Sequence, residues 1–95
     1  MKASWSKRAL IQLRAAKEWI EKDNPLAARE FVEAVEDLAD LLGEYPGMGV
    51  RTDEEGVVMF PLVRYRYLVF YRVLTGGEVR IIRIRHASRK RQTSR

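Results

Sequence analysis

The sequence predicts an α+β fold in which a helical hairpin is followed by a small antiparallel β-sheet. Apolar residues recur every three or four positions from residue 9 to residue 42, and at every second position after residue 57. With 95 residues, the chain has material for one hydrophobic core. We therefore expect a single domain over residues 1–95, with loosely held ends at residues 1–5 and 90–95.

The first predicted helix begins after Ser4 or Ser6, either of which can cap a helix N-terminus, and ends near Lys22. Its core-facing stripe consists of Ala9, Leu13, Ala16 and Ile20. A second apolar row, formed by Ile11, Ala15 and Trp19, lies roughly 80–100° further round the helix. Large aromatic side chains usually belong to the core, so burial of Trp19 within the domain is the simpler expectation, and cover by a partner is the alternative.

The second predicted helix begins at Asn24-Pro25 and runs to about Leu42. Asn is a favoured N-cap residue, and Pro at the first helical position lacks the amide hydrogen that would stay unpaired. The predicted buried face consists of Ala27, Ala28, Phe31, Val32, Val35, Leu38, Ala39 and Leu42. The opposite, solvated arc consists of Glu30, Glu33, Glu36, Asp37 and Asp40. We expect Gly43 to end the helix in a left-handed conformation, before Pro46 and Gly47.

Three strands are predicted in the second half of the chain. Residues 57–61 form a short strand, which Pro61 places at an edge or at an end of the sheet. Residues 65–74 and 78–85 are rich in β-branched and aromatic side chains. Gly76-Gly77 joins these two strands in a tight hairpin, because glycine readily adopts the positive φ angles of such turns.

The hairpin predicts a register if Thr75 pairs with Glu78. Leu74 then faces Val79, Arg72 faces Ile81, Phe70 faces Arg83 and Leu68 faces Arg85. The face predicted to meet the helices carries Tyr67, Val69, Tyr71, Val73, Ile82 and Ile84, with Arg80 and His86 at its ends. The face predicted to meet a partner carries Arg66, Leu68, Phe70, Arg72, Leu74, Val79, Ile81, Arg83 and Arg85. A three-residue loop would shift this parity.

Positive charge is concentrated in the second half of the chain. Residues 1–50 hold seven basic and nine acidic residues, a net charge of −2, whereas residues 51–95 hold eleven and four, a net charge of +7. From Arg83 onward there are six basic residues and no acidic one. Such a segment favours a polyanion or an acidic protein surface, the alternative being a solvated tail that aids solubility.

Composition also excludes several kinds of site. The chain has no cysteine, and His86 is its one histidine, so no disulfide, metal site or cofactor is expected. No segment approaches the roughly 20 apolar residues that span a membrane, and residues 1–7 lack the apolar run of a signal peptide. The expected location is therefore the cytoplasm.

Four short segments stand in a characteristic order and spacing. They are residues 24–28 (Asn-Pro-Leu-Ala-Ala), 46–49 (Pro-Gly-Met-Gly), 67–73 (Tyr-Leu-Val-Phe-Tyr-Arg-Val) and 84–89 (Ile-Arg-His-Ala-Ser-Arg). Together they make nearly the whole chain resemble the RelE/ParE superfamily, the toxins of bacterial type II toxin–antitoxin systems. The resemblance implies a helical hairpin packed on one side of a curved sheet, and a ParD-like antitoxin whose C-terminal helix or strand wraps the toxin.

The superfamily contains two activities: RelE-like members cleave messenger RNA on the ribosome, and ParE-like members poison DNA gyrase. No lysine lies between Lys22 and Lys90, so the lysine-based constellation of some RelE-like members is absent. The Asn-Pro-x-Ala-Ala helix start and the His-x-x-Arg ending also look more like ParE-like chains. The resemblance therefore implies a gyrase inhibitor that acts by protein–protein binding and has no catalytic site. The residues expected to bind the target are Arg83, Arg85, His86 and Arg89, and those expected to bind the antitoxin are Trp19, Leu68, Phe70 and Arg72.

The alternative activity is that of a ribosome-dependent mRNA endoribonuclease of the RelE type. Some members of that type use a glutamate, an arginine and a histidine, which here are Glu54 or Glu55, Arg64 or Arg66, and His86. The set that we select is Glu55, Arg66 and His86. Cleavage through a 2′-hydroxyl needs a base, a cation near the phosphorane and an acid. A third possibility, a small nucleic-acid-binding module, is less favoured because the basic face lacks aromatic residues interleaved with lysines.

Overall fold

A computed structural model of the chain describes residues 3–89, without the side chain of Arg89. Residues 90–95 and the first two residues, for which the sequence predicts loosely held ends, lie outside the described residues. In chain order the elements are β1 (Ser4–Trp5), α1 (Lys7–Glu21), α2 (Pro25–Glu44), the 3₁₀ turn η1 (Pro46–Met48), β2 (Val50–Arg51), β3 (Val58–Leu62), the 3₁₀ turn η2 (Val63–Tyr65), β4 (Tyr67–Val73), β5 (Val79–His86) and the 3₁₀ turn η3 (Ala87–Arg89).

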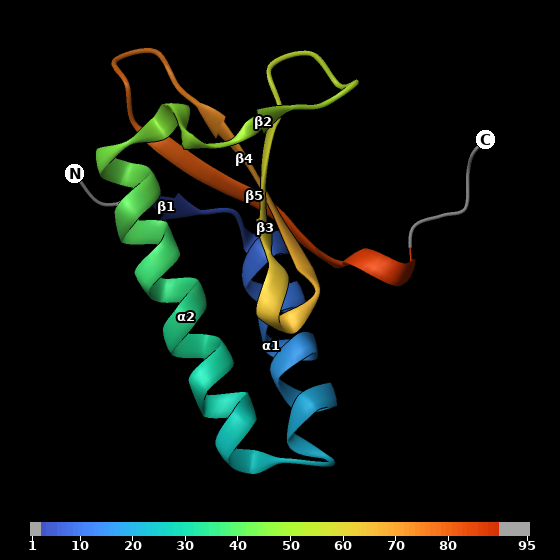
Figure 1. The fold of residues 1–95 in the computed structure, drawn as a ribbon. Coiled ribbons are helices and arrows are strands. Elements are labelled where there is room, and N and C mark those ends of the chain that lie inside the picture. The colour runs from blue at the N-terminus through green and yellow to red at the C-terminus, as the bar shows by residue number, and fades with distance from the viewer. Residues whose placement is uncertain (1–2, 90–95) are drawn as a thin grey trace.

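The described strands form a five-stranded sheet in the order β1-β5-β4-β3-β2. The helical hairpin of α1 and α2 packs on one face of it, which confirms the predicted α+β fold (Figure 1). The sheet is mixed rather than wholly antiparallel, because Ser4 and Trp5 pair in parallel with Arg80 and Ile81. A two-residue strand carries no periodicity in the sequence, so this pairing was not predicted.

Helix α1 begins where the sequence predicts. The Ser6 hydroxyl oxygen accepts the N–H of Ala9 at 3.0 Å and so caps the helix, while the hydroxyl donates to the carbonyl of Ile82 at 3.2 Å. The predicted stripe faces the core, since Ala9 and Ala16 are buried. The expectation that the domain buries Trp19 is wrong, because this side chain is 59% exposed on the outer row of the helix.

Helix α2 begins at the predicted cap, where the Asn24 side-chain oxygen accepts the N–H of Ala27 at 3.0 Å. The predicted helix end at Gly43 is wrong, because α2 continues to Glu44. The chain leaves the helix at Tyr45, with φ −128° and ψ 71°, since a residue before proline is driven out of the helical region and Pro46 follows. The acidic arc is exposed as predicted, and the predicted apolar face supplies these buried residues: Ala28, Phe31, Val35, Leu38, Ala39 and Leu42.

Most buried side chains of the described residues form two clusters between the helices and the sheet. One cluster consists of Ala9, Leu38, Ala39, Leu42, Val69, Tyr71, Val79 and Ile81. The other consists of Ala16, Phe31, Val35, Tyr67 and Ile84. Strands β4 and β5 contribute to both clusters, so the two central strands carry the core on one face and leave the other face available for a partner.

The predicted register of the β4–β5 hairpin is right at the end far from the turn. Phe70 pairs with Arg83, and Leu68 pairs with Arg85. These two arginines therefore stand on the face turned away from the helices, as predicted.

Near the turn the predicted register is wrong by one residue. The N–H of Leu74 donates to the carbonyl of Glu78, so residues 75–77 form a three-residue loop, and Arg72 pairs with Arg80 instead of Ile81. A β-bulge next to Phe70 and Tyr71 leaves Ile82 unpaired and restores the predicted register beyond it. Val79 and Ile81, predicted to face a partner, are consequently buried in the core.

Candidate functional site

The face of the sheet turned away from the helices carries four arginines on its two central strands. We call it the arginine face and define it by Leu68, Phe70, Arg72, Arg80, Arg83 and Arg85. The corrected register adds Arg80, which was predicted to lie toward the helices, because Arg80 now pairs with Arg72. Four cations on neighbouring strands repel one another unless anions lie between them, so the arrangement is suited to binding negative groups.

Phe70 forms the platform on which two of these cations rest. Its side chain is 5% exposed although it lies outside the helix-covered core. The guanidinium carbon of Arg83 lies 4.4 Å from the ring centroid, and that of Arg85 lies 5.0 Å from it. Both distances are within the range of cation–π attraction. Phe70, predicted to touch the antitoxin, therefore holds two guanidinium groups in place.

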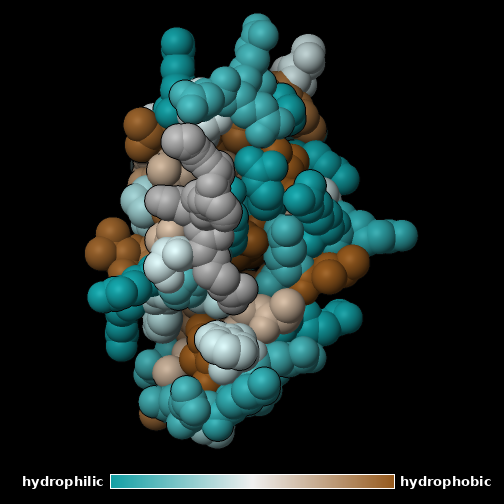
Figure 2. All heavy atoms as spheres, turned by 90° about the vertical axis from the view of Figure 1, so that its right-hand side faces the viewer, coloured by the Kyte–Doolittle hydropathy of each residue, from teal (hydrophilic) through white to brown (hydrophobic). Residues whose placement is uncertain are grey.

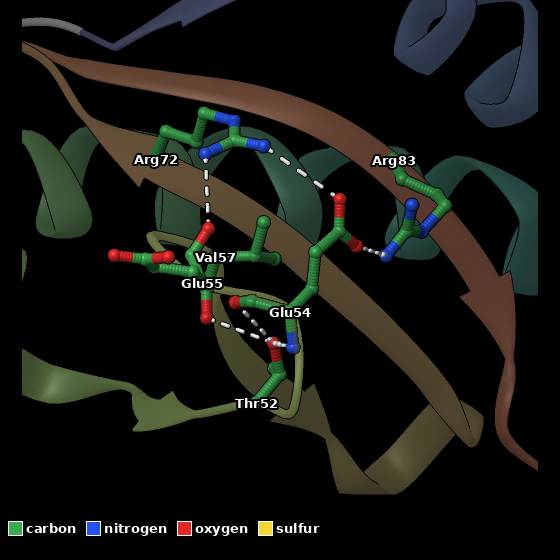
Figure 3. Close-up of polar contacts among 6 residues, drawn as sticks. All are labelled: Thr52, Glu54, Glu55, Val57, Arg72 and Arg83. Carbon is green, nitrogen blue, oxygen red and sulfur yellow. Dashed lines mark hydrogen bonds and ion pairs between the residues drawn. The ribbon is translucent and has the colours of Figure 1, made fainter.

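One carboxylate, that of Glu54, lies between two of the arginines (Figure 3). Its Oε1 is 3.4 Å from Nη2 of Arg83, and its Oε2 is 3.6 Å from Nη2 of Arg72. The Nε of Arg83 is buried and has no hydrogen-bond partner among the described residues. The guanidinium of Arg83 is therefore incompletely satisfied in this state.

The loop that carries Glu54 is closed by hydrogen bonds among its own residues. The Thr52 hydroxyl oxygen accepts the N–H of Glu54 at 3.1 Å, and the Glu54 carbonyl accepts the N–H of Val57 at 3.0 Å. Arg72 also donates from Nη1 to the carbonyl of Glu55 at 3.3 Å. Gly56 has φ +78°, and a Cβ there would lie 2.8 Å from Nη1 of Arg72. The loop and Arg72 thus fit closely against each other.

Tyr71 anchors the segment that leads into this loop. The side chain is fully buried, and its hydroxyl donates to the carbonyl of Pro46 at 2.8 Å and accepts the N–H of Gly49 at 3.0 Å. Burial raises the pKa of the Tyr71 hydroxyl above its ordinary value, and the hydrogen bond from Gly49 opposes this in part. Sequence reasoning placed Tyr71 in the core but could not find its role, because its partners lie more than 20 residues away.

A second feature lies on the helix side of the sheet, where an open pocket of about 430 Å³ separates α1 from the end of β5. It is lined by Gln12, Ala15, Ala16, Trp19, Tyr67, Ile84, Arg85 and His86. The His86 ring stands edge-on to Tyr67, with centroids 4.9 Å apart, and its Nδ1 accepts the N–H of Ser88 at 3.2 Å. The Ser88 hydroxyl oxygen also lies 2.8 Å from this Nδ1.

The structure separates the residues predicted to bind the target. Arg83 and Arg85 lie on the arginine face, whereas His86 lies toward the helices because side chains alternate along a strand. The side chain of Arg89 lies outside the described residues.

The set considered for RNA cleavage is not brought together. The Glu55 carboxylate points away from Arg83 (Figure 3), Arg66 is exposed at a left-handed position between η2 and β4, and His86 lies on the helix side. Of the other candidates, Arg64 pairs with Glu30 on α2 at 3.7 Å. Only Glu54, of these residues, meets the arginine face through its side chain in the described chain.

The side of the molecule that lies at the right of Figure 1 is mostly hydrophilic, with hydrophobic residues in separate small groups (Figure 2). A partner that docks on this side meets polar groups more than one continuous apolar patch. Among residues 3–89, no three histidine, aspartate or glutamate side chains are grouped so that they could hold a metal ion. No helix in the described part of the chain is long and apolar enough to cross a membrane.

The sequence of the chain is similar to those of known toxins. The family model of the ParE toxin of the type II toxin–antitoxin system parDE matches residues 3–91. Toxin RelE2 of Caulobacter vibrioides is 41% identical over 88 residues, which cover 90% of this chain and 93% of that protein. The putative toxin Y4kP of Sinorhizobium fredii is 32% identical over 83 residues, covering 87% and 84% of the two chains.

A solved structure described as the chromosomal ParDE TA system from P. aeruginosa superimposes with a TM-score of 0.78. It is 24% identical in sequence, and the match covers 90% of this chain and 95% of that one. At this level of sequence identity, the structural similarity supports the fold alone. It agrees with the helical hairpin on a five-stranded sheet described above.

Proposed function

Because the chain belongs to the ParE toxin family of type II toxin–antitoxin systems, we propose that it inhibits DNA gyrase in the cytoplasm by protein–protein binding and is neutralised by a ParD-like antitoxin. The observation that supports the gyrase proposal is the arginine face, a preorganised set of cations on which residues 3–89 bring together no acid and base. Gyrase inhibition needs a binding surface, whereas RNA cleavage needs a base, a cation and an acid around one phosphate.

The chemistry of Arg83 and Arg85 supports a binding role. Guanidinium groups keep their charge when partly buried and form planar, bidentate contacts with carboxylates. Phe70 restricts both side chains, so less conformational entropy is lost when a partner binds. We assign target binding to Arg83 and Arg85, and we keep His86 and Arg89 as further candidates from the sequence.

The proposed antitoxin contacts lie on both sides of the sheet. Trp19 is exposed at the helix-side pocket, whereas Leu68 and Arg72 are half-buried on the arginine face, with Phe70 beneath the guanidinium groups. An antitoxin that touches all of them must pass around the end of the sheet. An extended or helical segment wrapped over the toxin meets this requirement, and a compact domain docked on one face does not.

A supercoiling assay with purified DNA gyrase tests the proposal. The toxin should inhibit supercoiling, and an Arg83→Ala/Arg85→Ala double variant should raise the half-inhibitory concentration by about tenfold or more, the cost typical of a buried arginine contact. Arg29→Ala, which removes one exposed arginine from α2, serves as the control and should leave inhibition unchanged. If the toxin stops translation in a cell-free system and leaves supercoiling untouched, the gyrase proposal is wrong.

The second candidate function is that of a ribosome-dependent mRNA endoribonuclease, favoured by the 41% identity to a protein named toxin RelE2. Glu55, Arg66 and His86 would then have to converge on the ribosome. Primer extension after induction of the toxin would reveal cuts inside translated codons, and His86→Ala would abolish them. Intact transcripts at toxic doses would exclude this activity.

A further inference from the structure

The Glu54 carboxylate occupies the arginine face from within the same chain. Each of its two oxygens faces a different guanidinium group, that of Arg83 at 3.4 Å and that of Arg72 at 3.6 Å. We infer that Arg72 and Arg83 form a binding site for a carboxylate side chain of an acidic protein partner, and that Glu54 competes for this site until the partner displaces it.

The two ion pairs of Glu54 are weak enough for a carboxylate of a partner to replace them. Strong contacts between arginine and carboxylate have N···O distances of about 2.7–2.9 Å, and both distances here are longer. The Glu54 side chain is 53% exposed, so water already solvates it in part. Exposed ion pairs of this kind contribute little to stability, and their loss is readily offset by a better-placed carboxylate.

The arginines, in contrast, are held in place without Glu54. The Arg83 side chain is 21% exposed and packs on the ring of Phe70. Arg72 donates a hydrogen bond to the carbonyl of Glu55. The Nε of Arg83 has no partner among the described residues, so Glu54 engages only part of the guanidinium fork. Because this Nε is buried, a partner carboxylate that approaches from solvent replaces Glu54 at the Nη2 atoms of Arg72 and Arg83, where it can form shorter contacts than Glu54 does.

Displacement of Glu54 does not require the loop to unfold. The hydrogen bonds that close the loop use the backbone N–H and carbonyl of Glu54, whereas the ion pairs use its side chain. Rotation about the side-chain bonds therefore releases the carboxylate while Thr52 and Val57 keep the backbone in place.

The charges around the site favour an acidic protein over a nucleic acid. Asp53, Glu54 and Glu55 follow one another in the loop beside Arg72. A nucleic acid would bring a row of phosphates past three carboxylates, whereas a single partner carboxylate replaces Glu54 without adding charge at the site. The geometry of Arg72 and Arg83 supports a carboxylate site, and the identification of gyrase as the source of the carboxylate rests on the proposed function.

The test compares two substitutions that remove the same charge from the same loop. Glu54→Gln removes the internal competitor, and Glu55→Gln is the matched control, because the Glu55 carboxylate makes no ion pair within residues 3–89. The probes are a fluorescein-labelled peptide with six glutamates and a labelled oligothymidylate with six phosphates, followed by fluorescence anisotropy at about 150 mM salt. At this ionic strength distant charges are largely screened.

We expect Glu54→Gln to bind the acidic peptide about three- to tenfold more tightly than Glu55→Gln, the range set by the loss of two exposed ion pairs. Adding Arg83→Ala to Glu54→Gln should remove this gain. Equal affinities for Glu54→Gln and Glu55→Gln would overturn the inference. A gain confined to the oligothymidylate would also overturn it and would identify a phosphate site.

Testing the same variants in the supercoiling assay shows whether the carboxylate site or the gyrase proposal is wrong. If Glu54→Gln gains peptide affinity and no variant inhibits gyrase, the carboxylate site stands and the gyrase proposal fails. If the toxin inhibits gyrase and the two glutamine variants bind the peptide equally, the gyrase proposal stands and the inference fails.

Discussion

Replacing Tyr71 by phenylalanine should destabilise the protein far more than the loss of one oxygen atom suggests. The Tyr71 hydroxyl is the partner of two backbone groups, the carbonyl of Pro46 and the N–H of Gly49. Phenylalanine keeps the ring in the core and leaves both backbone groups without that partner. The perturbation therefore isolates two hydrogen bonds that join both ends of η1 to the centre of the sheet.

The expected cost follows from the burial of these groups. A buried polar group left unpaired costs about 1–3 kcal/mol. Pro46 and Gly49 are half-buried, so water can reach them in part, and the lower half of this range applies to each. The total loss in the free energy of unfolding is then about 2–4 kcal/mol. For a domain of this size, each 1 kcal/mol shifts the Tm by about 4–8 °C, so a fall of about 8–32 °C is expected.

Urea and thermal unfolding followed by circular dichroism measure this loss. Tyr45→Phe is the matched control, because Tyr45 is 57% exposed, and it should change stability by less than about 0.5 kcal/mol. If Tyr71→Phe and Tyr45→Phe unfold at the same urea concentration, the assignment of Tyr71 as the anchor of this segment is refuted. A changed urea dependence with an unchanged midpoint would also count against it.

Because burial raises the pKa of Tyr71 above its ordinary value near 10, the unfolded chain loses this proton first, and stability should fall as the pH rises above about 10. Unfolding midpoints from pH 8 to 11 should therefore fall more steeply for the wild type than for Tyr71→Phe. Trp19→Ala should change the stability of the free toxin by less than about 1 kcal/mol, since the side chain is mostly exposed, yet weaken antitoxin binding about tenfold or more in calorimetric titrations. Asn24→Ala should cost about 1 kcal/mol in urea unfolding, because it removes the acceptor for the N–H of Ala27, and an unchanged midpoint would contradict the capping role.

The helices could be predicted from the sequence because their signals are local. Ser6 and Asn24 accept amide hydrogens three residues further along the chain, and apolar residues at three- and four-residue spacing indicate which side is buried. The predicted end of α2 at Gly43 was wrong, because Pro46, three residues later, decides where this helix ends. The pairing of Phe70 with Arg83 could also be predicted, because the register of a hairpin follows from its turn and from the alternation of side chains along each strand.

The candidate site could not be predicted from local sequence patterns, because its contacts join residues that lie far apart in the chain. Glu54 was one of several loop carboxylates until the fold brought it to Arg83, 29 residues away, and Tyr71 acquired its role from Pro46, 25 residues away. The bulge at Ile82 decided which face Val79 and Ile81 occupy, and α1 packed so that Trp19 stayed exposed. By itself, the sequence determined the helices, the helix stripes that face the core and the position of the basic residues along the chain. The tertiary structure alone decided which charges meet, because such contacts depend on how elements far apart in the chain pack together.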